Sequence, residues 1–325
     1  MELKFSIVVP VYNRPEEIEE LLSSLSNQTD RDFEVIVMEA VGGKSCEQVC
    51  RKYADKLEIK FVREDTDRSA RRNHGMQLAK GNYFILFDSD CIIPKNYIFT
   101  LRRLLTEDYV DCYGGPDAAM ADFSVVQRAV NYSMTSFFTT GGIRGAMKDV
   151  HKYLPRAFNM GFSRFVFEKI GGYRQMIGED VDLSMRIKEA GFSVKLIKEC
   201  YVYHKRRVTL LSFYRQVNTF GKARVLLSKL HPHGLKLTHL LPTFFVLGNL
   251  LLLGLTFYRW YFILPLLLYI LLLFLHSFVL NRDIRVALLS PITAYLQLFG
   301  YGVGFIQEFV TGKASKSAAE TLYRQ

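Results

Sequence analysis

The chain has 325 residues, a formal net charge of +10 and a hydrophobic content of 49%. Its apolar residues are concentrated between residues 240 and 310, which argues against a wholly soluble protein and favours a soluble domain followed by a membrane region. The positive charge gathers just before that region and no RNA- or DNA-binding motif is present, so we expect contact with a membrane and none with nucleic acid. Five cysteines without C-x-x-C spacing favour a reducing compartment.

Strands are expected to alternate with helices over the first 205 residues. The expected strands cover residues 5–9, 33–38, 59–62, 83–87, 110–113, 194–197 and 202–203. The expected helices cover residues 16–25, 46–53, 69–79 with Ser69 as N-cap, 94–105, 162–170 and 181–190. This alternation predicts an α/β fold with a parallel sheet covered on both faces and ligands at the carboxyl ends of its strands. Residues 118–158 contain no clean strand, and we expect helix and a mobile, glycine-rich loop there.

The pattern changes beyond residue 208. A basic amphipathic helix is predicted over residues 210–230, lying along the bilayer surface. Residues 240–258 and 261–280 each approach the about 20 apolar residues that cross a bilayer, and residues 286–310 form a weaker third candidate. The positive-inside rule puts the basic residues and the N-terminal domain on the cytoplasmic side of an inner membrane. The expected domains are residues 1–208 (α/β), 209–238 (interfacial helix), 239–312 (two to three transmembrane helices) and 313–325 (polar tail).

The sequence FILFDSDC places two carboxylates directly after a buried strand. Burying an unpaired carboxylate costs several kcal/mol, so Asp88 and Asp90 should have a partner. Two aspartates separated by one residue at a strand end can share one divalent cation together with the phosphates bound to it. A tripeptide of this kind is a weak signal alone, but its position at the end of a parallel strand strengthens it.

A second group of acids lies in IGEDVDLSMRIKEAG, where Glu179, Asp180 and Asp182 lead into a helix. Capping of the helix N-terminus would explain one or two of them, and Asp182 in particular. Three acids in four residues exceed what capping needs. A carboxylate at the edge of a pocket can also act as general base toward an acceptor hydroxyl.

Three stretches, taken together, resemble family 2 glycosyltransferases of the GT-A fold, whose Rossmann-like sheet is mostly parallel. They are SIVVPVYNRPEEIEELLSSL, RSARRNHGMQLAKGNYFILFDSDC and NMGFSRFVFEKIGGYRQMIGEDVDLSMRIKEAGF, in that order. The resemblance covers about residues 4–225. The following YRQVNTFGKARVLLSKLHPHG and the apolar segments are similar to membrane-bound exopolysaccharide glycosyltransferases of the succinoglycan type.

The resemblance implies roles for individual residues. Asp180 would be the catalytic base, with Glu179 beside it at the acceptor. Asp88, Asp90 and His204 would hold Mg²⁺ or Mn²⁺, with a plain structural role for His204 as the less favoured alternative. Residues implied in binding the nucleotide-diphospho-sugar are Pro10, Tyr12, Arg14, Arg68, Arg71, Asn73, Asp88, Arg215 and Gln216.

One position departs from the family pattern. The family usually has two aspartates after the second strand, where this chain has Met38-Glu39-Ala40. Glu39 could still accept a hydrogen bond from a uracil-like base. Its longer side chain leaves the choice between UDP and GDP open.

The implied function is inverting transfer of a sugar from a nucleotide-diphospho-sugar to a hydroxyl of a lipid-linked or glycan acceptor, in cell-surface polysaccharide synthesis. Two alternatives remain open. The acceptor could be a polyprenyl phosphate, or the protein could be a non-catalytic, nucleotide-binding membrane subunit of a glycan-assembly complex. A processive synthase is less favoured, since about three spans would give too little channel wall. The oligomeric state cannot be read from the sequence.

Overall fold

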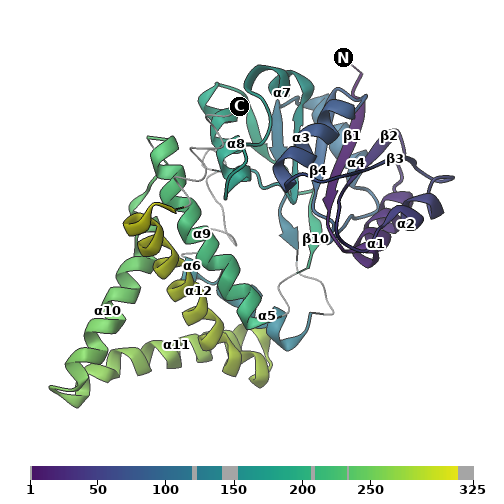
Figure 1. Cartoon of the computed structure of the whole chain (residues 1–325). Helices are drawn as coiled ribbons and strands as arrows, with labels where there is room; N and C mark the ends of the chain where they lie inside the picture. Colours follow the sequence, from purple (N-terminus) through teal and green to yellow (C-terminus); the bar gives the residue numbers. More distant parts are fainter. Residues whose placement is uncertain (1, 119–122, 141–152, 206–208, 233, 314–325) are drawn as a thin grey trace. The chain divides into compact units, whose positions relative to one another are not determined.

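The chain forms two compact units in the computed structural model (Figure 1). The α/β unit comprises residues 1–120 and 149–205, and the helical unit comprises residues 121–148 and 206–325. A single break at residue 208 is therefore a wrong description, because a segment from the middle of the expected N-terminal domain belongs with the C-terminal helices. The residues described are 2–118, 123–140, 153–205, 209–232 and 234–313.

The α/β unit contains the expected alternation of strands and helices. Its strands are β1 (Phe5–Val11), β2 (Phe33–Ala40), β3 (Glu58–Glu64), β4 (Tyr83–Phe87), β5 (Cys91–Ile92), β6 (Cys112–Gly114), β7 (Asp117–Ala118), β8 (Asn159–Ser163), β9 (Val194–Leu196) and β10 (Val202–His204). Its helices are α1 (Pro15–Ser26), α2 (Glu47–Lys52), α3 (Arg68–Leu78), α4 (Tyr97–Glu107), α7 (Arg164–Ile170) and α8 (Glu179–Glu189). The N-cap of α3 is Asp67, which accepts from two backbone N–H groups, and not Ser69 as expected.

The main sheet has seven strands in the order β3-β2-β1-β4-β8-β6-β9. All neighbours are parallel except where β8 pairs, because β8 runs antiparallel to both β4 and β6. The expected helix over residues 162–170 is therefore partly wrong: the chain is a strand up to Ser163 and becomes helical only at Arg164. A second sheet has the strand order β5-β10-β7. Its strand β5 follows β4 closely in the chain, and this sheet carries some of the candidate functional residues.

Strand residues alternate between two apolar layers. Ile7 and Ile85 face one layer with residues of α1, α2 and α4, whereas Val8 and Phe84 face the other with residues of α3, α7 and α8. Both layers are almost fully buried, as expected when helices cover both faces of a mostly parallel sheet. The carboxyl end of β4 is thus held by packing on two sides.

The helical unit is built on a long pairing between α9 and α12, which lie side by side in Figure 1. Its helices are α5 (Val125–Thr135), α6 (Phe137–Thr140), α9 (Leu210–Leu230), α10 (Leu241–Thr256), α11 (Leu264–Asn281) and α12 (Ile284–Thr311), with short turns η2 (Leu237–His239) and η3 (Trp260–Ile263). The expected helix over residues 210–230 is confirmed, but one face of it is buried. A Cβ at Gly221 would lie 2.1 Å from the Tyr301 carbonyl oxygen, and a Cβ at Gly304 2.1 Å from that of Asn218.

Helix α5 is fixed to this unit by polar contacts. Arg128 binds Asp283 at 3.0 Å, and the Thr293 hydroxyl donates to the Ala129 carbonyl at 2.9 Å. The Tyr132 hydroxyl lies 2.9 Å from Nδ1 of His276. These bonds explain why residues 121–148 group with the C-terminal helices. Most of the loop expected over residues 139–145 lies outside the described residues.

Two helices of the described chain are long and apolar enough to cross a membrane, on length and composition alone. They comprise residues Trp260–Asn281 (22 residues) and Ile284–Thr311 (28 residues). The first expected span becomes α10, whose 16 residues fall short of the about 20 that a bilayer crossing requires. The segment with the weakest expectation of a span, residues 286–310, thus lies in the longest helix. The segment 240–258 forms a helix that is shorter than expected.

Candidate active site

The acids of the D-x-D sequence lie in a tight turn at the end of β4. The backbone N–H of Cys91 donates to the Asp88 carbonyl at 3.2 Å, which closes the turn. Ser89 donates to Oε2 of Glu17 at 3.1 Å and ties the turn to α1. The side chains of Asp88 and Asp90 remain 27% and 15% exposed, so both are accessible from outside the sheet.

Asp88 is paired with Arg72, a residue that the motif analysis did not single out. Nη2 of Arg72 donates to Oδ1 of Asp88 at 2.7 Å, and Nη1 donates to Oε1 of Glu179 at 2.9 Å. Only 1% of the Arg72 side chain is exposed. Burial alone would raise the pKa of the Asp88 carboxyl, but the Arg72 charge holds that pKa below its ordinary value. Asp88 is therefore a fixed carboxylate.

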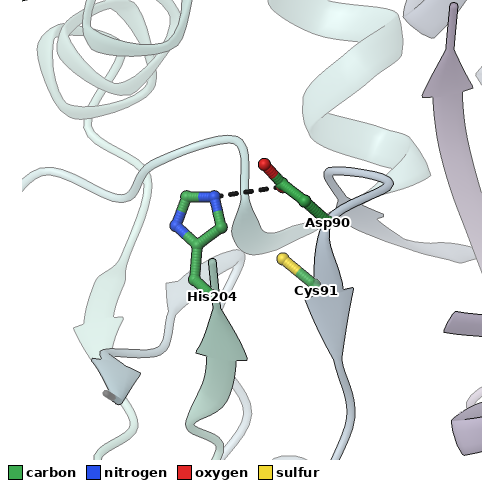
Figure 2. Close-up of side chains that lie close together, drawn as sticks. All are labelled: Asp90, Cys91 and His204. Atoms are coloured by element: carbon green, nitrogen blue, oxygen red, sulfur yellow. Dashed lines mark ion pairs between the residues drawn. The ribbon is translucent and has the colours of Figure 1, made fainter. Parts of the chain in front are cut away.

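Asp90 faces His204, as Figure 2 shows. Antiparallel pairing of β10 with β5 sets His204 opposite Cys91 in the small sheet. Nε2 of His204 lies 3.1 Å from Oδ1 of Asp90, and the imidazole stacks on the Phe158 ring at 4.8 Å. Burial would lower the pKa of His204, but the neighbouring Asp90 carboxylate holds it above its ordinary value.

The Asp90–His204 pair has the composition of a cation site. Oδ1 of Asp90 and Nδ1 of His204 are buried and make no hydrogen bond within the described part of the chain, which is unusual for buried polar atoms. Cys91 completes a cluster whose possible ligand atoms lie within 4.8 Å of one another. Its thiol, however, donates to the Phe158 carbonyl at 3.4 Å, and burial raises its pKa. Hard cations such as Mg²⁺ favour the carboxylate over this protonated sulfur.

Arg14 adds positive charge beside the turn. Its Nη1 lies 2.9 Å from Oε2 of Glu17 and 3.6 Å from Oδ2 of Asp90. The side chain is 40% exposed. Arg14 therefore lies beside Asp90, and its contact with a donor remains a prediction.

The second acid group begins α8, immediately after Gly178 in the left-handed conformation (φ 79°). Glu179 accepts from Arg68 at 2.8 Å as well as from Arg72, and is nearly buried. Asp180 lies 3.4 Å from Nη1 of Arg156 and is 21% exposed. Arg72 thus joins the acids at the end of β4 to those at the start of α8.

Asp182 belongs to the scaffold and not to the accessible site. It is fully buried and binds Arg174 at 3.1 Å and Arg186 at 2.9 Å. Arg186 also donates to the carbonyls of Ile170 and Gly172. These bonds hold the chain between α7 and α8 and so support Glu179 and Asp180, which corrects the interpretation of Asp182 as a simple cap.

Two residues predicted to contact the nucleotide are engaged within the protein. Arg71 donates to the Thr66 carbonyl. The Asn73 side chain makes two hydrogen bonds to the backbone of Tyr173, at 2.8 and 2.7 Å. Neither meets the acids at the end of β4, whereas Arg68 reaches Glu179.

Glu39 is also engaged internally. Its carboxylate is fully buried and accepts from the backbone N–H of Cys46 at 2.6 Å and the Ser45 hydroxyl at 2.8 Å. Nε of Arg63 lies 3.1 Å away. A base that donates a hydrogen bond to Glu39, as expected, would compete with these donors, because the carboxylate now holds the loop after β2.

The remaining predicted residues lie at two places. Pro10 is buried in β1, and Tyr12 follows that strand with 53% of its surface exposed. Arg215 and Gln216 lie on α9, in the helical unit and not in the α/β unit that carries the acids. Sequence reasoning missed Arg72, Glu17 and Arg156 at this site. Only Arg72 had a signal, the RSARRN sequence, and that pointed equally to its neighbours.

A mostly parallel sheet with acids at the end of β4 and at the start of α8 is consistent with a GT-A-like fold. The sequence profile of Glycosyl transferase family 2 matches residues 6–171, about half of the chain, so this protein belongs to that family.

Curated relatives resemble only part of the chain. The poly(ribitol-phosphate) beta-glucosyltransferase of Bacillus spizizenii is 39% identical over 115 residues, which are 34% of this chain and 18% of that protein. The poly(ribitol-phosphate) beta-N-acetylglucosaminyltransferase TarS of Staphylococcus aureus is 32% identical over 114 residues, 34% of this chain and 20% of that one. The matched segment is thus a fifth or less of either relative.

Solved structures agree in fold over most of the chain. The mannosyltransferase PcManGT from Pyrobaculum calidifontis, in complex with GDP-Man and Mn²⁺, has a TM-score of 0.66 and 16% identity, with 96% of this chain and 88% of that chain covered. S. aureus TarS 1–349 in complex with UDP-GlcNAc has a TM-score of 0.50 and 19% identity, with 95% and 92% covered. At these identities the likeness shows the GT-A-like fold alone.

Proposed function

We propose that this family 2 glycosyltransferase moves a sugar from a nucleotide-diphospho-sugar to a hydroxyl of a lipid-linked or glycan acceptor. The observation that carries the proposal is the Arg72 bridge, which holds an acid of the D-x-D turn and an acid of α8 in one site. PcManGT and TarS, which share the fold, were solved with GDP-Man and UDP-GlcNAc. Because these bases differ and Glu39 is engaged internally, the base of the donor stays open.

Asp90 and His204, with Asp88 beside them, would hold a divalent cation such as Mn²⁺ or Mg²⁺. Among the described residues, the buried Oδ1 of Asp90 has no hydrogen bond beyond its 3.1 Å contact with His204, which supports this assignment. When bound, the cation supplies positive charge that offsets the charge developing on the leaving diphosphate. Arg14 beside Asp90 and Arg68 beside Glu179 would add to that positive field.

Asp180 would act as the general base. It is partly exposed at the start of α8, and a carboxylate there can take the proton of an acceptor hydroxyl. The hydroxyl oxygen forms the new bond to the anomeric carbon while the bond from that carbon to the diphosphate oxygen breaks. The nucleoside diphosphate leaves with the electron pair, and attack from the opposite face inverts the anomeric configuration.

Membrane association is part of the proposal. The two candidate spans and the basic residues of α9 support a cytoplasmic active site at the inner membrane. A membrane-bound site suits a lipid-linked acceptor and the synthesis of a cell-surface polysaccharide, including the succinoglycan-type exopolysaccharides whose enzymes the tail resembles.

The test is a screen of UDP- and GDP-sugars against the purified full-length protein in lipid, with Mn²⁺, Mg²⁺ or chelator, reading out nucleotide release. We expect release from at least one donor, dependent on the cation and stimulated by a lipid extract that contains acceptor. Binding of nucleotide without release under every condition would contradict the proposal and favour a non-catalytic membrane subunit.

A further inference from the structure

A single buried guanidinium sets the spacing of two acids that come from distant parts of the chain. Asp88 ends β4 and Glu179 begins α8, and each receives one hydrogen bond from the two terminal nitrogens of Arg72, at 2.7 and 2.9 Å. The guanidinium is planar, so the two bonds fix the distance and the relative orientation of the two carboxylates. A lysine could supply the charge but could not reproduce this fork.

The surroundings of Arg72 hold it in that position. Its guanidinium carbon lies 5.1 Å from the centre of the Tyr173 ring, a cation–π contact inside the protein. The next residue, Asn73, clamps the backbone of the same tyrosine with two hydrogen bonds. Two consecutive residues of α3 therefore fix both the loop before α8 and the first acid of α8.

We propose that Arg72 is a positioning residue that holds the donor-side acid Asp88 and the acceptor-side acids of α8 in register. This inference rests on the proposed function, since only the roles assigned there make Asp88 a donor-side group and Asp180 the base. Through Glu179, Arg72 fixes the first turn of α8 and with it the neighbouring Asp180. Arg72 touches neither the donor nor the acceptor in this assignment, so its loss should slow the reaction more than it weakens donor binding.

Arg102, also in the α/β unit, is a matched control for the loss of stability that follows from removing a bound arginine. Nε of Arg102 lies 2.6 Å from Asp30, and its guanidinium carbon lies 4.5 Å from the centre of the Phe5 ring. Arg102 thus also combines a carboxylate with an aromatic ring, and its other partners, the carbonyls of Leu3 and Asp32, lie outside the candidate site. Replacing it removes comparable contacts without touching the acids at β4 or α8.

The experiment compares Arg72→Lys, Arg72→Met and Arg102→Met in the full-length protein, with the donor that the screen identifies. For Arg72→Lys we expect turnover to fall about 100-fold while the donor Kd changes less than about threefold, because orientation is lost and not a donor contact. Arg102→Met should lower the thermal midpoint but keep most of the turnover. Arg72→Lys combined with Glu179→Gln should be no slower than the slower single variant, since both changes break the same link.

Each other outcome overturns the inference in a distinct way. Wild-type turnover in folded Arg72→Lys would show that the fork is not needed. A donor Kd that weakens in proportion to turnover would make Arg72 a binding residue, and an equal loss in Arg102→Met would make the effect one of general stability. If Arg72→Met fails to fold, Arg72→Lys still decides. An inactive wild type would instead refute the proposed function on which the inference rests.

Discussion

The two acids of the D-x-D turn have different neighbours, although a single serine separates them. Asp88 is bound by the fixed charge of Arg72, whereas Asp90 lies against an imidazole and near the half-exposed Arg14. At Oδ1 of Asp90, a cation at this turn would compete with the 3.1 Å contact from Nε2 of His204, since this oxygen makes no further hydrogen bond in the described chain. We therefore expect Asp90 to be the principal ligand and Asp88 to serve mainly in orienting the turn.

Replacing Asp90 should remove the response to the metal. In Asp90→Ala, we expect Mn²⁺-dependent nucleotide release to be lost, because the carboxylate that faces His204 is removed while Asp88 stays bound to Arg72. Titration of Mn²⁺ against initial rate measures the effect, with Cys91→Ser as the matched change in the same cluster. Cys91→Ser should keep the response, since its thiol donates to a carbonyl. Equal loss in both variants, or an unchanged rate in Asp90→Ala, would refute the metal assignment.

Replacing Asp180 should show whether the acceptor group is a hydroxyl or a polyprenyl phosphate. If the acceptor is a hydroxyl, Asp180→Asn should lower the rate of transfer by about 10²–10⁴-fold with little change in donor affinity, as expected for loss of a general base. The measurement is single-turnover transfer alongside donor binding. A polyprenyl phosphate needs no strong base, so retention of most of the activity would favour that acceptor and contradict the hydroxyl proposal.

At the residue scale, the sequence predicted some members of the candidate site and not others. Asp88 and Asp90 could be singled out because acids after a buried apolar run need partners, and Glu179 and Asp180 because three acids lead into one helix. Arg72 was not distinguishable from Arg71, because successive helix residues point about 100° apart and the phase of α3 depends on packing. The internal bonds of Glu39 likewise depend on how the loop after β2 folds back.

At the scale of elements, local pattern predicted most strands and helices but not all of the pairing. β8 was missed because its sequence, NMGFS, has little β-branched character and continues directly into a helix. Its antiparallel place between β4 and β6 is stabilised by the sheet and not by local propensity. Hydrophobic periodicity indicates local secondary structure and does not show which distant strands pair.

The pairing of α9 with α12 depends on glycines that allow close backbone contact. In Gly304→Ala the new methyl would lie 2.1 Å from the Asn218 carbonyl oxygen, so the helices must separate. We expect the helical unit to lose about 1–3 kcal/mol of stability, as for overpacking elsewhere. Thermal or denaturant unfolding in lipid or detergent measures the loss.

Gly248→Ala is the matched control on a neighbouring helix. Nothing lies within 4 Å of a Cβ at Gly248, so this change should be neutral or slightly stabilising through helix propensity. If both alanine variants were equally stable, the close packing of α9 against α12 would be contradicted.

For the whole molecule, the corner between α10 and α11 (Figure 1) leads to a prediction about the membrane. Its tip exposes Phe257, Tyr258 and Trp260, with Arg259 between them, a combination typical of a membrane–water interface. Trp260 is the single tryptophan of the chain, so its fluorescence reports on the tip without substitution. In vesicles, lipids brominated near the headgroup should quench it more than lipids brominated at the chain ends. Efficient quenching by aqueous iodide would show instead that the tip lies in water.

The chain passes between its two units three times, after residues 120, 148 and 205. Cutting it after Lys205, the obvious way to obtain a water-soluble enzyme, would keep α5 but remove the segment of α11 and α12, to which α5 is hydrogen-bonded. Apolar groups now hidden, such as Val130 and Met134, would then face solvent, and we expect that fragment to aggregate. A soluble version should also replace residues 121–148 with a short polar linker, so that α5 is not left without the helices against which it packs.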